Sequence, residues 1–195
     1  MWVICCTFAP DMIRLRDIST ADSQYAFVER LWLDAFPEAE RRDMDAQRAN
    51  TDTNPLFHCL LAETDNGQPV GFLTCWDFGT FCYGEHFATA PALRNHGYGG
   101  RIIRAVLQRA ARPFVLEVEM PEDELSRRRV GFYERNGLTL WQEIPYLQPA
   151  YRAAGECLPM YLMATHDLRP QKDAAHVIST IHRYVYGCVH SWQQH

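Results

Sequence analysis

Apolar and polar residues alternate along several short segments of the chain, a pattern typical of strands that place one face on a core. The predicted strands are residues 12–16, 56–63, 69–76, 81–89, 114–119, 138–143 and 159–165. If residues 81–89 alternate regularly, one face of this strand would carry Phe81, Tyr83, Glu85, Phe87 and Thr89. His86 would then point to the opposite face.

Elsewhere, apolar residues recur at the spacing of an amphipathic helix. Helices are predicted at residues 27–35, 102–110, 121–135 and 174–188, the segments that show this apolar spacing or begin with helix-capping residues. A very polar segment at residues 38–48 is expected to be helical but poorly anchored. Residues 50–55 are expected to form a loop, and residues 144–155 a loop rich in aromatic residues and proline.

A strand, a helix and a second strand follow one another between residues 81 and 119, which predicts a crossover with parallel strands. A chain of 195 residues is long enough for one sizeable core. We therefore predict an α+β (mixed α/β) domain at residues 12–166, preceded by an N-terminal extension at residues 1–11. Residues 167–195 are expected to form an amphipathic C-terminal helix that packs on the domain or lies at an interface.

The composition narrows the class of protein. A net charge of -5 argues against nucleic-acid binding, because phosphate recognition needs an excess of basic residues. The seven cysteines are scattered, which predicts reduced thiols in a cytoplasmic protein and no metal site. No segment approaches the roughly 20 apolar residues of a membrane span, so no membrane partner is expected.

One loop has the composition of a phosphate site. The segment Arg94-Asn95-His96-Gly97-Tyr98-Gly99-Gly100 follows a predicted strand and leads into a predicted helix. Glycines let backbone N–H groups approach an anion, and the positive end of the helix dipole favours negative charge there. The same glycines would also suit a plain tight turn.

Two motifs give this loop a context. Arg94 to Gly99 reads R-x-x-G-x-G, which resembles the acetyl-CoA signature of the GNAT acetyltransferase superfamily. Further on, Gly131-Phe132-Tyr133-Glu134-Arg135-Asn136-Gly137-Leu138 resembles the second recurrent element of that family. The similarity extends over about residues 12–165. A Rossmann fold fits less well, because a complete G-x-G-x-x-G is missing.

The resemblance implies a splayed, mostly antiparallel sheet of about six or seven strands with flanking helices and an extra C-terminal helix. Acetyl-CoA would lie between the strands that end near Thr89 and Glu119. The implied cofactor-binding residues are Phe87, Ala88, Thr89, Arg94, Asn95, His96, Gly97, Tyr98, Gly99, Gly100 and Arg101. Arg94 and Arg101 could instead be solvated arginines beside a loop.

The resemblance also implies catalytic roles. Tyr133 matches the family tyrosine that protonates the departing thiolate, although it could be a core aromatic. Glu85 is the candidate base, with a pKa raised by burial, and a structural or substrate-binding Glu85 is the alternative. Glu117 and Glu119 are further candidates for the base. Many relatives carry Asn and Ala where this chain has Ser126 and Arg129, so cofactor contacts from that helix are in doubt.

The acceptor would approach past residues 36–42 and the loop at residues 145–152. In that loop Tyr146 and Tyr151 are candidate substrate-binding residues, unless they pack against the C-terminal helix. The acceptor is an unidentified amine. A non-catalytic protein that binds acetyl-CoA or CoA is the competing class, and the C-terminal helix could mediate a homodimer.

Overall fold

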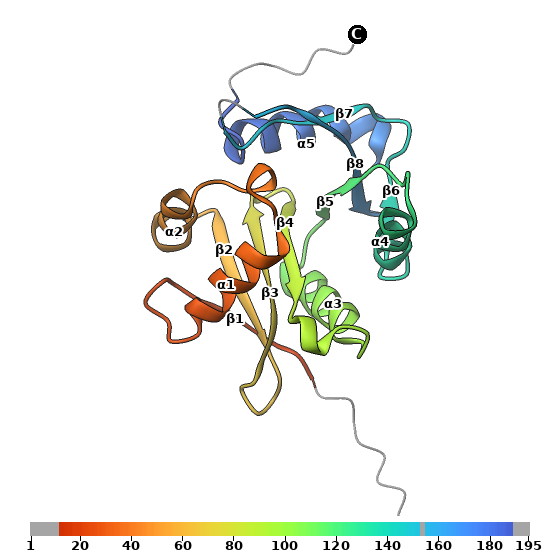
Figure 1. Cartoon of the computed structure of the whole chain (residues 1–195). Helices are drawn as coiled ribbons and strands as arrows, with labels where there is room; N and C mark the ends of the chain where they lie inside the picture. The colour runs from red at the N-terminus through yellow and green to blue at the C-terminus, as the bar shows by residue number, and fades with distance from the viewer. Residues whose placement is uncertain (1–11, 153–154, 189–195) are drawn as a thin grey trace, which may run out of the picture.

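The computed structural model describes residues 12–152 and 155–188 (Figure 1). The predicted extension at residues 1–11 lies outside the described residues, as do residues 153–154 and 189–195. Within the described ranges one sheet has the strand order β1-β2-β3-β4-β5-β8-β6, with β7 also paired to β8. The strands are β1 (Arg14–Asp17), β2 (Phe57–Glu63), β3 (Pro69–Asp77), β4 (Cys82–Thr89), β5 (Phe114–Glu119), β6 (Leu138–Leu140), β7 (Tyr146–Gln148) and β8 (Leu158–Thr165).

Helices cover both faces of the sheet. They are α1 (Tyr25–Ala35), α2 (Met44–Thr53), α3 (Tyr98–Ala110), α4 (Glu124–Glu134) and α5 (Pro170–Tyr184), with short 3-10 turns at Glu38–Glu40 and Pro91–Leu93. Apolar residues of α1 and α5 share one buried cluster, and those of α3 and α4 share another. Because strand side chains alternate between these clusters, the sheet separates an α1–α5 face from an α3–α4 face. The predicted mixed α/β fold is confirmed.

The sheet is divided along part of its length, because β4 and β5 pair only at their first residues and then separate. Their parallel pairing joins residues 82–84 to residues 114–116 and ends there. At the last pair, a Cβ on Gly84 would lie 2.6 Å from the Phe114 ring, so only glycine allows this close approach. Beyond this point the sheet forks, with β1 to β4 on one arm and β5 to β8 on the other (Figure 1).

A bulge in β4 changes the directions predicted for its side chains. Thr74 pairs with His86 while Cys75 pairs with Gly84, so Glu85 is the extra residue. Phe81 and Tyr83 pack in the α1–α5 cluster, whereas Phe87 packs in the other cluster, against Phe132. The expectation of one shared face for these residues is therefore wrong. His86 does not point to the opposite face, because its ring contacts Trp32 and Phe36 on the α1 side.

Two further segments differ from expectation. Residues 146–148, expected in a loop, form β7, which pairs with β8 in the register Tyr146↔Met160. Residues 50–53, also expected in a loop, continue α2, whose N-terminus is capped by Asp43. The polar segment before and within α2 is well anchored, because Arg42 and Gln47 are both buried.

The C-terminal helix packs on the domain. Its apolar stripe is buried in the α1–α5 cluster, where Val177, Ile178 and Ile181 have no exposed surface. The stripe is therefore covered by the chain itself. Among the described residues, no helix combines the length and apolar character required to cross a membrane.

Candidate active site

A cavity of about 1150 Å³ passes through the fork between β4 and β5. Phe87, Phe132 and Tyr133 line it from the α3–α4 side. Phe36 and Tyr151 line it from the α1–α5 side. The fork therefore opens the sheet to ligands from both faces.

The N-terminus of α3 forms one end of this cavity. Gly97 is its N-cap residue with φ 80° and ψ 0°, a left-handed conformation that glycine adopts without steric cost. Gly97, Gly99 and Gly100 line the cavity, where they present backbone rather than side chains. The N–H groups of a first helical turn have no intrahelical partners. This end of the cavity is suited to bind phosphate.

The other loop residues divide into two groups. Arg94 and Asn95 line the cavity, and Arg94 Nε donates to the β4 backbone at 3.4 Å. His96, Tyr98 and Arg101 lie outside the cavity wall. The Arg101 guanidinium lies 5.2 Å from the Tyr98 ring centroid. The structure thus brings the glycines and Arg94 to the cavity but not these three side chains.

The end of β4 offers free backbone to a ligand. Phe87, Ala88 and Thr89 line the cavity. Their edge toward β5 lies beyond the last β4–β5 pair, so among the described strands β4 has a ladder partner only on its β3 side. An extended ligand can add to such an edge as a further strand.

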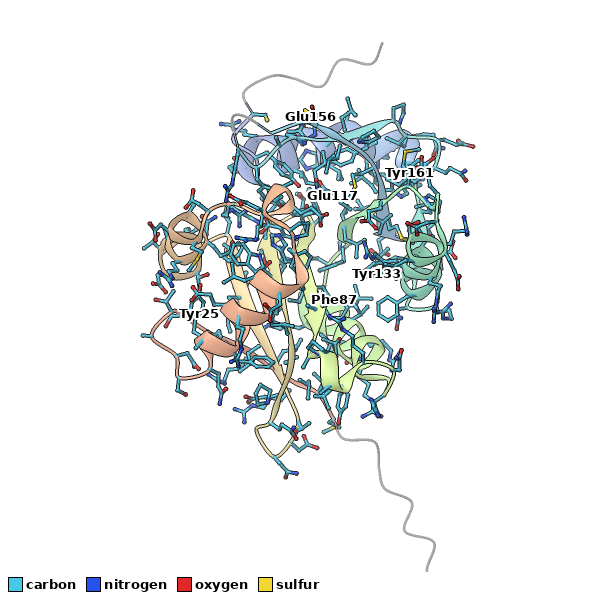
Figure 2. All side chains as sticks on the ribbon, viewed as in Figure 1. Tyr25, Phe87, Glu117, Tyr133, Glu156 and Tyr161 are labelled. Atoms are coloured by element: carbon cyan, nitrogen blue, oxygen red, sulfur yellow. The ribbon has the colours of Figure 1, made fainter. Side chains whose placement is uncertain are left out.

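Tyr133 lies in the cavity wall on the α3–α4 side, near Phe87 (Figure 2). The residue is 8% exposed, and burial raises the pKa of its phenol to about 12. Its hydroxyl has no hydrogen-bond partner among residues 12–152 and 155–188. The phenol is therefore protonated at neutral pH and available to a ligand in the cavity.

Ser126 and Arg129 of α4 both line the cavity but are occupied. Ser126 completes a capping box with Asp123, and its Oγ donates to the Asp123 carboxylate at 2.9 Å. Arg129 forms an ion pair with Glu119 at 2.5 Å. These two residues therefore stabilise the start of α4 and its contact with β5.

Glu85 stands on β4 where the fork opens, but its carboxylate is enclosed. Arg42 binds both of its oxygens, with Nη1 3.0 Å from Oε2, and Trp76 Nε1 donates to Oε2 at 3.2 Å. Tyr151 donates to Oε1 at 3.0 Å. The side chain has 0% exposed surface, so a ligand in the cavity cannot touch the carboxylate.

The expected raised pKa of Glu85 is wrong. Burial alone would raise the pKa of this carboxyl, but the Arg42 guanidinium and the hydrogen bonds from His86 and Arg42 lower it well below its usual range. His86 is buried beside Glu85, and its Nε2 donates to the Glu40 carbonyl at 3.0 Å. Glu85 is thus a permanent anion within a buried ion pair.

Glu117 follows Leu116 on β5, as Glu85 follows Gly84 on β4, and Gly84↔Leu116 is the last pair before the fork. Three neutral groups donate to its carboxylate: Tyr146 Oη, Gln148 Nε2 at 2.5 Å and Tyr186 Oη at 2.8 Å. Burial raises its pKa, against the lowering effect of these hydrogen bonds. Among the described residues, no basic side chain forms an ion pair with Glu117. Of the two carboxylates at the fork, Glu85 is therefore neutralised by Arg42, whereas Glu117 has no cation beside it among the described residues.

The two predicted substrate-binding tyrosines have different positions. Tyr151 lines the cavity and stacks on His86, with ring centroids 5.9 Å apart. Tyr146 is buried at 4% exposure behind the wall, where it binds Glu117. The structure therefore brings Tyr151 to the cavity and leaves Tyr146 in the layer behind it.

Sequence reasoning gave no role to three residues of this site. Arg42 and Gln148 lie within the ranges expected on the acceptor side but were not singled out, and Tyr186 was missed. Arg42 lies in a polar segment with no apolar stripe, and Tyr186 follows the C-terminal helix. Only their contacts with Glu85 and Glu117 reveal them, and those contacts join residues far apart in the chain. The tyrosine-rich composition of residues 146–151 was the one available signal for Gln148.

The fold and the site together define a class of protein. Its members have a forked mixed sheet, a cavity that crosses the fork, and a helix N-terminus suited to bind an anion at one end of that cavity. Comparisons with known proteins agree. The sequence profile of the Acetyltransferase (GNAT) family matches residues 25–138. No match was found among curated protein sequences.

Solved structures give the same result. A GNAT-family protein from Bacteroides thetaiotaomicron has 44% identity and a TM-score of 0.86, covering 90% of this chain and 99% of its own. Spermidine N-acetyltransferase from Vibrio cholerae, solved with CoA and spermine, has 14% identity and a TM-score of 0.59, covering 78% and 94%. A GNAT acetyltransferase from Elizabethkingia anophelis with acetyl-CoA bound has 16% identity and a TM-score of 0.55, covering 80% and 99%.

The chain belongs to the GNAT acetyltransferase family. The two more distant structures share the fold alone at their level of identity. The predicted family and fold class are confirmed. The eighth strand, β7, exceeds the six or seven expected because its three residues stand between Pro145 and Pro149, where alternation is too short to detect.

Proposed function

We propose that the chain transfers an acetyl group from acetyl-CoA to an amine by direct attack on the thioester. The observation that carries this proposal is the cavity that crosses the fork, with Gly97 and Tyr133 on one side and Tyr151 on the other. The cosubstrate would enter along the α3–α4 face and the amine from the α1–α5 face. The two reactants then meet where β4 and β5 separate.

The residues present fit acetyl-CoA. Gly97, Gly99 and Gly100 leave the space of side chains free at the helix N-terminus, and Arg94 adds positive charge. These groups suit a pyrophosphate, and the open edge of β4 suits the amides of a pantetheine arm. The bound acetyl-CoA supplies the acetyl thioester.

Two residues would handle protons. We assign to Tyr133 the role of general acid, because its protonated hydroxyl lies free in the wall of the cavity beside the fork. For the base, the structure favours Glu117 over Glu85. Both residues line the cavity, but the Glu85 carboxylate is closed off by Arg42, whereas Glu117 has no basic partner among the described residues. Its raised pKa also suits proton uptake better than the lowered pKa of Glu85.

Substitution of Gly97 tests the cosubstrate site. Gly97→Ala places a side chain at φ 80°, and relief of that strain would move the N–H groups that converge on the pyrophosphate. We expect CoA affinity to fall about tenfold or more, equivalent to about 1.4 kcal/mol of binding free energy. Calorimetric titration with CoA measures it.

Gly79 provides a matched control. It has the same φ of 80°, and a Cβ would also meet nothing within 4 Å, but it lies in the turn between β3 and β4, away from the cavity. Gly79→Ala should cost similar stability and leave CoA affinity unchanged. Equal CoA affinity in both variants would show that the loop is only a turn. Absence of CoA binding by the unaltered protein would reject the proposed function.

A further inference from the structure

Charge is separated along the cavity. At the α3 end, Arg94 and the helix N-terminus are positive. At the other end, Glu40 and Glu117 line the wall, and neither forms an ion pair with a basic residue in the described parts of the chain. Burial raises the pKa of both carboxyls. The side from which the acceptor would come therefore has an excess of carboxylates.

The hydrogen bonds of Glu117 fit its ionised form. Gln148 Nε2 can only donate, and the hydroxyls of Tyr146 and Tyr186 also point their protons at the carboxylate. When Glu117 takes up a proton as the base, a tyrosine hydroxyl oxygen can accept the hydrogen bond of the acid. Because all three partners are neutral, they stabilise the charge without cancelling it. The negative charge of Glu117 is thus not cancelled by an ion pair at the cavity wall, among the described residues.

At the same end of the cavity, the basic side chains that could bind a carboxylate are already engaged. His86 lines the wall, but its Nε2 donates to the Glu40 carbonyl at 3.0 Å. Among the described residues the arginines of the wall are Arg94 and Arg129. Arg94 belongs to the glycine loop, and Arg129 is paired with Glu119. The Arg42 guanidinium is 8% exposed and bound to Glu85 and Gln47. An acceptor that carries a carboxylate would therefore meet Glu40 and Glu117, while Arg129, the arginine whose charge acts on Glu40, is already paired with Glu119.

We propose that this enzyme acetylates cationic amines without a carboxylate, and that Glu117, held by Tyr146, Gln148 and Tyr186, is the group that selects them. The inference rests on the proposed acetyl transfer. It names the class of acceptor: alkylamines or arylalkylamines whose charge is positive, as distinct from α-amino acids. The aromatic ring of Tyr151, which lines the cavity and packs against Tyr186, suits the apolar part of such an amine.

Pairs of acceptors that differ only by a carboxylate test the proposal in the unaltered protein. Tyramine is compared with tyrosine, cadaverine with lysine, and histamine with histidine, each with acetyl-CoA, by release of free CoA thiol. We expect kcat/KM to be about 10- to 100-fold higher for the amine than for the amino acid of at least one pair. Equal use of both members, or a preference for the amino acids, overturns the proposal.

Substitution of the selecting group gives the second arm. Glu117→Gln keeps the size of the side chain and removes the charge. Turnover should fall with every acceptor, because Glu117 is also the proposed base, so the quantity compared is the ratio of kcat/KM between the two members of a pair. We expect this ratio to shrink to about threefold or less, the effect of losing one close charge. Glu143→Gln removes a charge from an exposed residue outside the cavity wall and should leave the preference unchanged. A full preference retained in folded Glu117→Gln protein overturns the role of Glu117.

CoA binding separates this inference from the proposed function. Titration with CoA is carried out on each variant, together with a melting curve. If the unaltered protein binds CoA and transfers acetyl to amino acids as readily as to amines, the choice of acceptor is wrong and acetyl transfer stands. If it neither binds CoA nor releases thiol with any acceptor, the proposed function itself fails.

Discussion

Tyr133→Phe is expected to lower kcat by about 10²- to 10⁴-fold, the usual contribution of a positioned acid, while CoA affinity hardly changes. The substitution removes only a hydroxyl that has no partner in the described structure, so the ring keeps its packing against Phe132 at a centroid distance of 5.1 Å. The measurement is kcat at saturating acetyl-CoA with any accepted amine. The expected loss of kcat applies where proton transfer limits the rate.

Tyr25 is a matched control for this experiment. It is 7% exposed, and burial raises its pKa to about 12, as for Tyr133, but it lies at the start of α1 and outside the cavity wall (Figure 2). Tyr25→Phe should therefore leave kcat unchanged. A loss of less than about threefold in Tyr133→Phe, with an unchanged melting curve, would remove Tyr133 from the mechanism. A large loss of stability would identify its hydroxyl as a structural group.

The second large effect concerns the buried ion pair between Arg42 and Glu85. Glu85→Gln leaves the Arg42 guanidinium buried without a counter-charge, which typically costs about 3–5 kcal/mol. For a chain of this size the melting temperature should fall by about 10 °C. Arg42→Met should be similarly harmful, because it leaves the Glu85 carboxylate unpaired. Combining both substitutions should destabilise far less than the sum of the two.

This double-mutant cycle also decides what Glu85 does. If Glu85 only supports the wall, the Arg42→Met/Glu85→Gln protein should recover both stability and turnover toward the unaltered protein. Recovery of stability without turnover would restore Glu85 as the base. The exposed pair of Arg128 and Glu124 serves as control, since Glu124→Gln is expected to leave the melting temperature unchanged.

The sequence was sufficient to predict the features that depend on local pattern. Alternation and helical spacing located most strands and helices, and two motifs identified the glycine loop and the helix of Tyr133. These features involve residues close together in the chain, so a single segment carries the whole signal. The placement of the glycines at a helix N-terminus follows from the same local information.

Features that depend on distant contacts were not predictable. The bulge at Glu85 reverses the side-chain directions beyond it. Gly84 was the one local signal for it, since an isolated glycine in a strand often marks a bulge, but a glycine alone does not fix the register. The lowered pKa of Glu85 depends on Arg42, which reaches the fork from the segment between α1 and α2. Burial of a lone carboxyl raises its pKa, so the prediction failed for lack of that partner.

The position of α5 bears on the order in which the chain can fold during synthesis. Its residues Val177, Ile178 and Ile181 complete the cluster that also contains Ile18 and Val28 from the start of the chain. The apolar face that α5 covers, where its His176 contacts Phe81 and its His182 contacts Tyr146, therefore stays open to water until the ribosome has made α5. We expect nascent chains that stop before residue 170 to bind chaperones, because their exposed apolar surface favours aggregation.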